Sequence, residues 1–224
     1  MFGIPVMPRL LIVNPNSTVA MTEQMGHTAQ SVIGDQAEIQ TRTNVTGPAA
    51  IEGCWDGVWA GPGVLKILTE ESYDAAIIGC FDDTALEAAQ EVCSVPVIGI
   101  GQASFHAASL LGRRFVVVTT RQISVPILED NIQKLGLWSR CGGVVASEIG
   151  VLQLERDPVA SKQILEQIAE KTVQSLRPNV LVLGCAGMTG FADSLSTRLG
   201  IPVIDPIVAA TSLALALARM AATR

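Results

Sequence analysis

The sequence predicts an α/β protein with two pseudo-symmetric α/β domains, each a mainly parallel sheet flanked by helices, and an active site in the cleft between them. Three observations lead to this prediction. Short apolar strands alternate with helical segments along the whole chain of 224 residues. Aromatic residues make up only 4% of the sequence, so Val, Ile, Leu and Ala build the core, as in buried parallel strands. The pattern of the first half recurs in the second half.

The first half, residues 1–100, contains four apolar runs that we predict to be strands. Asn16 or Ser17 caps the first helix, and Asp82 or Asp83 is expected to cap the third. Pro62 makes the second helix less regular. The predicted order is strand 9–13, a helix ending at 33, strand 37–42, helix 57–70, strand 75–79, a helix ending at 92, and strand 95–100.

The second half, residues 101–206, repeats this alternation after a connecting helix. Pro158 suits the first turn of a long helix, because its missing N–H would have no partner there. The predicted order is helix 102–111, strand 115–119, helix 124–135, strand 144–148, helix 158–176, strand 180–184, a helix ending at 199, strand 202–204, and a closing helix from 207.

Two alignments support a duplicated unit. The interval from Cys80 to Cys185 equals the interval from Val13 to Val118. The residues before the two cysteines also correspond, Ile-Ile-Gly in one half and Val-Leu-Gly in the other. Apolar strands of similar composition can align by chance, but matched features at nearly one offset favour duplication.

Composition and charge exclude several classes of protein. Hydrophobic residues make up 49% and charged residues 16%, a balance that excludes a disordered chain. The net charge of −6 argues against nucleic-acid or membrane binding. The longest apolar run, residues 207–222, is interrupted by polar residues and too short to span a bilayer. We therefore expect a cytoplasmic protein with a small-molecule substrate, and the low charge fraction favours a homo-oligomer.

The five cysteines do not resemble a metal site or a disulfide framework. No two of them form a Cys-x-x-Cys pair, and the two histidines stand alone in the sequence. We therefore expect reduced thiols and predict neither a metal nor an organic cofactor.

Two of these thiols occupy positions suited to chemistry. Cys80 follows Gly79 and Cys185 follows Gly184, each at the carboxyl end of a strand, where parallel sheets bind ligands. Free N–H groups at a helix start favour the reactive thiolate. Thiols from two halves that face each other could remove a proton from one side of a carbon and return one to the other side. The alternative for each cysteine alone is a small buried hydrophobe.

Polar residues at neighbouring strand ends are candidates for substrate binding. Three of them, Asn14, Asn16 and Ser17, follow the first strand. Thr119 and Thr120 occupy the equivalent position in the second half. The alternative is a plain helix cap and turn. Residues 51–63 are a candidate for a pocket wall.

Four motifs together resemble the hydantoin racemase family, which includes hydantoin and allantoin racemases and belongs to the aspartate/glutamate racemase superfamily. They are residues 13–18 (Val-Asn-Pro-Asn-Ser-Thr), 79–83 (Gly-Cys-Phe-Asp-Asp), 118–120 (Val-Thr-Thr) and 184–188 (Gly-Cys-Ala-Gly-Met).

The resemblance implies cofactor-independent racemisation at C5 of a 5-monosubstituted hydantoin, allantoin or an amino-acid hydantoin, with Cys80 and Cys185 as the catalytic pair. It also implies a tetramer or hexamer, a link to purine catabolism, and the return of residues 207–224 to the first half. The residues that carry over as substrate-binding are Asn14, Asn16, Ser17, Gly79, Phe81, Thr119, Thr120, Gly184, Ala186 and Gly187.

Two alternatives stay open at this point. One is another reaction of the superfamily, such as amino-acid racemisation. Amino-acid racemases usually have Cys-Asn-Thr and Cys-Thr-His, whereas this chain has Phe81-Asp82 and Ala186-Gly187 after its cysteines, which suits a neutral ring better. The other alternative is a non-catalytic small-molecule binding module with two lobes.

Overall fold

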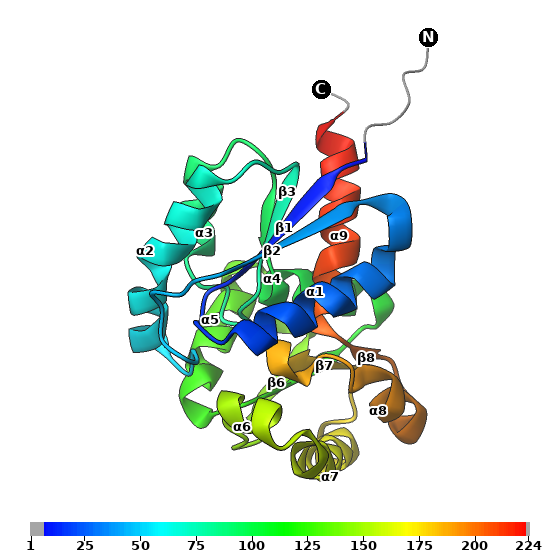
Figure 1. Ribbon diagram of the computed structural model, residues 1–224. Coiled ribbons are helices and arrows are strands. Elements are labelled where there is room, and N and C mark those ends of the chain that lie inside the picture. The colour runs from blue at the N-terminus through cyan, green and yellow to red at the C-terminus, as the bar shows by residue number, and fades with distance from the viewer. Residues whose placement is uncertain (1–6, 223–224) are drawn as a thin grey trace.

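The computed structural model describes residues 7–222 and contains two four-stranded sheets flanked by helices (Figure 1). The strand order is β2-β1-β3-β4 in one sheet and β6-β5-β7-β8 in the other, and every pair is parallel. The two orders correspond strand for strand, which confirms the predicted fold class.

The first sheet, and the helices that follow its strands along the chain, come from residues 9–111. The strands are β1 (Arg9–Asn14), β2 (Glu38–Thr43), β3 (Ala75–Ile78) and β4 (Val97–Gly99). The helices are α1 (Val19–Ile33), α2 (Cys54–Glu70), α3 (Leu86–Val92) and α4 (Ile100–Leu111).

The second sheet is built in the same way from the second half. The strands are β5 (Phe115–Thr119), β6 (Cys141–Ala146), β7 (Val180–Gly184) and β8 (Val203–Ile204). The helices are α5 (Val125–Lys134), α6 (Val151–Arg156), α7 (Pro158–Leu176), α8 (Ala192–Leu199) and α9 (Pro206–Ala221).

Burial on both faces explains the apolar runs. β3, β5 and β7 are buried along their whole length, because helices cover both sides of each sheet. The edge strand β2 is only partly buried and carries polar residues. Removing the central strands from water supplies the main driving force for folding each half.

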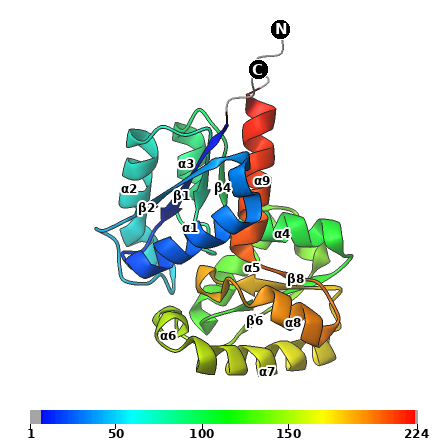
Figure 2. The ribbon, with the colours of Figure 1, turned by 45° about the vertical axis from the view of Figure 1, so that its right-hand side comes forward.

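The last helix, α9, packs on α1, α4 and β3, and Figure 2 shows it beside the first sheet next to α4. The return of residues 207–224 to the first half stays a prediction. The division of the chain into domains 1–100 and 101–206 stays a prediction, and residues 223–224 lie outside the described part. No helix within residues 7–222 combines the length and apolar character needed to cross a membrane.

Some predicted boundaries were wrong. The strand expected at 144–148 runs from Cys141 to Ala146. It starts earlier because the edge strand includes an irregular stretch, in which Gly143 has a φ of 141°. It ends earlier because the chain turns away from the sheet at Glu148, which has a φ of 59°. Strand 95–100 shortens to Val97–Gly99, since α4 starts at Ile100. Helix α6 was not expected.

Asp83 does not cap α3, which begins only at Leu86. Its carboxylate instead accepts hydrogen bonds from the N–H groups of Gly101 (2.9 Å) and Gln102 (2.7 Å) at the start of α4. A Cβ at Gly99 would lie on top of this carboxylate, so the close approach requires glycine there. The loop after β3 is therefore tied to the helix after β4.

The second half makes an equivalent connection, but there the carboxylate lies at the start of the helix and not in the cysteine loop. Asp205, which precedes α9, accepts from the N–H groups of Ile207 (2.9 Å) and Val208 (3.3 Å). It also accepts from the Thr189 hydroxyl (2.8 Å) and the Gly190 N–H (2.7 Å) in the loop after β7. One buried carboxylate in each half thus holds the cysteine loop against a helix start.

We predict that Asp205→Ala lowers the free energy of unfolding by about 2–4 kcal/mol, because it removes a helix cap and leaves buried donors unpaired. Urea unfolding followed by circular dichroism measures this change. The control is Asp193→Ala in the exposed first turn of α8, which should cost less than about 0.5 kcal/mol. Equal losses in the two variants would contradict the role of Asp205.

Candidate active site

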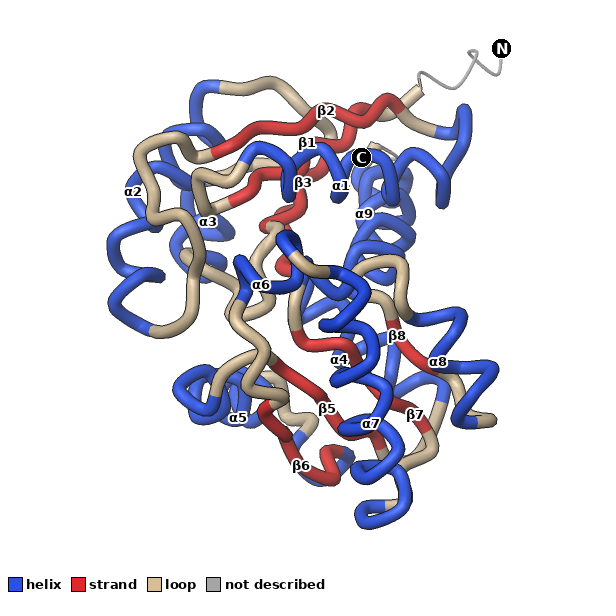
Figure 3. Tube along the Cα trace, turned by 60° about the horizontal axis from the view of Figure 1, so that its bottom comes forward, coloured by secondary structure: helices blue, strands red, loops and turns tan. Residues whose placement is uncertain are grey.

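A small cavity of about 30 Å³ lies between the two halves and contains both motif cysteines. Figure 3 shows the two sheets one above the other, with α6 at the level between them. A cavity of this size holds about two water molecules and is far smaller than a typical ligand pocket. The lining residues are Asn16, Met21, Met25, Ile51, Gly79, Cys80, Phe81, Asp82, Thr120, Ser124, Val151, Gly184, Cys185, Ala186 and Gly187.

Cys80 follows the end of β3. Gly79 donates its N–H to the Val13 carbonyl (2.8 Å), and a Cβ at position 79 would strike Met25, so glycine brings the chain close to β1 here. Burial raises the pKa of the Cys80 thiol, and the Asp82 carboxylate raises it further. The Asp82 N–H and the Thr84 hydroxyl lie near the sulfur and oppose this rise.

Cys185 follows β7 in the same way. It is only 8% exposed, and its sulfur accepts a hydrogen bond from the Gly187 N–H (3.4 Å). Burial raises the pKa of Cys185 to about 12; the Gly187 N–H opposes this rise, whereas the carboxylates of Asp82 and Glu52 add to it. In both halves, the backbone N–H two residues after the cysteine points to the sulfur.

The two thiols act on each other electrostatically, since the charge of Cys185 raises the pKa of Cys80. At neutral pH both sulfurs therefore carry protons in the closed cavity. One negative charge can be accommodated at a time, because a second thiolate would face the first across a small buried space.

The structure brings most of the predicted binding residues to this cavity and leaves three out. Asn14, Ser17 and Thr119 do not line it. Asn14 instead holds Asn16 in place, because its Oδ1 accepts from the Asn16 N–H (3.1 Å) and its Nδ2 donates to the Asn16 Oδ1 (3.0 Å). Thr119 donates to the carbonyl of Gly184 (3.1 Å) and so braces the strand end that carries Cys185.

The sequence analysis did not identify several lining residues. Met21 and Met25 come from α1, Ser124 from the turn before α5, and Val151 from the start of α6. Met21, Met25 and Val151 are apolar and Ser124 is a single serine, so none of them carries a chemical signal in the sequence. Asp82 was expected only as a helix cap, yet burial and the nearby Asp56 raise its pKa to about 7, and it faces both thiols. The position of Asp82 directly after Cys80 and Phe81 in the sequence could have indicated that its carboxylate lies near the thiols.

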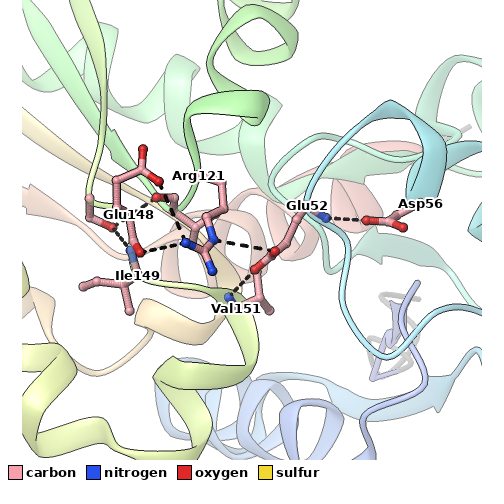
Figure 4. A network of polar contacts seen from close by, with 8 residues as sticks. Glu52, Asp56, Arg121, Glu148, Ile149 and Val151 are labelled. Carbon is pink, nitrogen blue, oxygen red and sulfur yellow. Dashed lines mark hydrogen bonds and ion pairs between the residues drawn. The ribbon is translucent and has the colours of Figure 1, made fainter.

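A polar network joins the two halves beside the cavity (Figure 4). Glu52 precedes α2, and its Oε1 accepts from the Val151 N–H at the start of α6 (2.7 Å). Its Oε2 lies 3.7 Å from Arg121 Nε, and Arg121 also donates to the carbonyl of Glu148 (3.1 Å). We call this cluster of Glu52, Arg121 and the backbone of Glu148 and Val151 the Glu52 latch. It closes the segment that contains Ile51 onto the second half.

Of residues 51–63, the candidate pocket wall, Ile51 lines the cavity and the two tryptophans lie away from it. Trp55 and Trp59 belong to α2 and are 80% and 56% exposed, so they do not form its wall. Among the described residues, no group of three His, Cys, Asp or Glu side chains is placed to hold a metal ion. The predicted tetramer or hexamer stays a prediction.

Two parallel α/β halves that each place a cysteine loop at a shared cavity are the arrangement of the racemase fold. A family model for Asp/Glu/hydantoin racemases matches residues 10–214, so the chain belongs to that family. The family implies a small-molecule substrate.

Individual relatives agree with this assignment. The chain is 39% identical over 209 residues to a hydantoin racemase of Pseudomonas sp. (strain NS671), which covers 92% of this chain and 84% of that protein. The crystal structure of an allantoin racemase from Pseudomonas fluorescens matches with a TM-score of 0.91 and 34% identity over 95% of this chain and 92% of the other. The structure of an allantoin racemase from Klebsiella pneumoniae matches with a TM-score of 0.92 and 31% identity, and the match covers 96% of this chain and 89% of the other.

We predict that Glu52→Ala opens the latch and speeds iodoacetamide labelling of Cys80 and Cys185 about tenfold at fixed pH, because charge-assisted hydrogen bonds no longer hold the cavity closed. Peptide mass spectrometry measures the labelling of each thiol, with the partly exposed Cys141 of β6 as internal reference. The control Glu71→Ala removes the ion pair to Arg42 within the first half and should leave labelling unchanged. Unchanged labelling in Glu52→Ala would contradict the latch.

Proposed function

We propose that this protein is a cofactor-independent racemase that inverts C5 of a 5-monosubstituted hydantoin. The observation that carries the proposal is the shared cavity, which one thiol enters from each half of the fold. Membership of the Asp/Glu/hydantoin racemase family supports the reaction class.

In the proposed mechanism the substrate ring lies between Cys80 and Cys185. One sulfur, as thiolate, removes the C5 proton, and the electron pair of the C–H bond moves into the neighbouring C4 carbonyl to give an enolate. The other sulfur, as thiol, donates its proton to the opposite face of C5. The product is the other enantiomer, and the two cysteines have exchanged protonation states.

The N–H groups near each sulfur stabilise whichever one is the thiolate. The Asp82 N–H serves Cys80 and the Gly187 N–H serves Cys185, so the site is equivalent for both directions of the reaction. Asn16 and Thr120 line the cavity and are the side chains we expect to hydrogen-bond the ring. Because the closed cavity is much smaller than a hydantoin, substrate entry requires the halves to separate at the Glu52 latch.

We predict that Cys80→Ser and Cys185→Ser each lower racemisation by at least about a thousandfold, because one proton donor or acceptor is lost. In D2O each variant should still exchange the C5 proton of one enantiomer, which NMR detects, while polarimetry records little loss of rotation. Cys54→Ser is the matched control. Normal racemisation by either cavity variant would remove that cysteine from the mechanism.

The raised thiol pKa values predict an alkaline pH dependence. A thiol with a pKa near 12 is protonated at neutral pH, so the active thiolate fraction grows as the pH rises. We expect kcat/KM to increase about tenfold between pH 8 and 9. The increase between pH 7 and 8 should be smaller, because Asp82 is still gaining charge there and raising the thiol pKa values. Initial rates by polarimetry test this. A decrease over the same interval would contradict it.

A further inference from the structure

The carboxylate of Asp82 lies at the thiol cavity and acts on both sulfurs. Asp82 lines this cavity together with Cys80 and Cys185. Its charge raises the pKa of each thiol, whereas the charge of Glu52 acts on Cys185. Because interactions between charges weaken with distance, Asp82 lies near both sulfurs. The carboxylate thus borders the space between the two thiols.

The backbone of Asp82 is held from both halves of the fold. Its N–H lies near the sulfur of Cys80, and its carbonyl accepts a hydrogen bond from Asn131 of α5 (3.1 Å). The next residue, Asp83, ties the same loop to the start of α4. Asp82 therefore has a fixed position beside the cavity, which a residue that orients a substrate requires.

The carboxylate of Asp82, in contrast to its backbone, is not fully committed within the protein. Its oxygen Oδ2 is buried and has no hydrogen-bond partner among residues 7–222. Asp83 uses both of its carboxylate oxygens on backbone N–H groups. An unpaired buried acceptor costs free energy, and folded proteins rarely tolerate one without a reason. Its position beside both thiols indicates that the substrate supplies the missing donor when the cavity widens around a ring.

A group that faces both sulfurs has a particular advantage in a racemase. The two enantiomers of a 5-monosubstituted hydantoin can place their ring atoms alike and exchange only the proton and the substituent between the two faces of the ring. A contact beside one sulfur meets one face and favours one enantiomer. A contact between the sulfurs meets the edge of the ring, and it can therefore orient both enantiomers for proton transfer.

The chemistry of a carboxyl group limits which edge of the ring it meets. A carboxylate only accepts hydrogen bonds, and a protonated carboxyl group still keeps an acceptor oxygen. A negative carboxylate would repel the charge that develops on the C4 oxygen, so the ring must turn an N–H group toward Asp82. N1–H is attached to C5, the atom that lies between the sulfurs, whereas N3–H lies across the ring. N1–H is therefore the matching donor.

We propose that Asp82 is a substrate-binding residue that accepts a hydrogen bond from N1–H of the hydantoin ring and so holds C5 between the two sulfurs for either enantiomer. This inference rests on the proposed function. It restricts the substrates to hydantoins with a free N1–H group.

Methylated substrates test which edge of the ring is bound. The parent substrate is 5-benzylhydantoin or allantoin, whichever the wild-type protein racemises faster, and it is compared with its 1-methyl and 3-methyl derivatives by polarimetry. We expect kcat/KM to fall at least about a hundredfold for the 1-methyl derivative and less than about tenfold for the 3-methyl derivative. A loss at N3 as large as the loss at N1 would overturn the proposal.

Variants of Asp82 separate the hydrogen bond from the size of the side chain. Leu is similar in size to Asp but has no acceptor, whereas Asn keeps one. In Asp82→Leu the preference for the parent over the 1-methyl derivative should shrink at least about tenfold, because no hydrogen bond remains to be lost. The matched control Asp82→Asn should keep most of this preference. The altered thiol pKa changes the rates of both substrates together, so the ratio of their kcat/KM values reports the contact.

The outcomes separate the two proposals. If the wild-type protein racemises neither parent substrate, the proposed function is wrong. If it racemises one of them through Cys80 and Cys185, but Asp82→Leu keeps the wild-type preference for a free N1–H, the function stands and the proposal for Asp82 is wrong. The comparison of methylated substrates needs no variant, so it decides the proposal even if Asp82→Leu fails to fold.

Discussion

The site depends on two buried carboxylates that hold the cysteine loops. Asp83 reaches from the loop after β3 to the start of α4, and Asp205 reaches from the start of α9 to the loop after β7. Each joins the carboxyl end of one strand to the helix that follows the next strand. Strand ends alone would leave the cysteine loops free to move. These ties give both sulfurs a fixed position at the boundary between the halves.

Closure and acidity are linked in this arrangement. The Glu52 latch brings Ile51 and Val151 together over the cavity, and the same closure removes water from both sulfurs. Burial is the largest cause of the raised pKa of each thiol. In the closed site both thiols are therefore neutral, and a charge on one sulfur depends on the N–H donors at its own loop.

The loop from Cys80 to Ala85 carries several functions in six residues. It supplies one thiol, the carboxylate that ties the loop to α4, and part of the lining of the thiol cavity. It also contains two residues in the left-handed region, Asp83 and Ala85, and a carboxylate oxygen of Asp82 that has no hydrogen-bond partner. Stability lost there is compensated by the fully buried strands on either side, which allows a strained polar segment to persist inside a stable fold.

The sequence by itself determined the two α/β halves, because buried parallel strands must be apolar, and it placed Cys80 and Cys185 at equivalent strand ends. It also indicated most residues that surround them. Only the tertiary structure decided that Asn14 and Thr119 brace the site rather than line it, that Asp83 caps α4, and that Glu52 meets Arg121. These outcomes depend on distances between segments far apart in the chain, and periodicity within one segment carries no information about such distances.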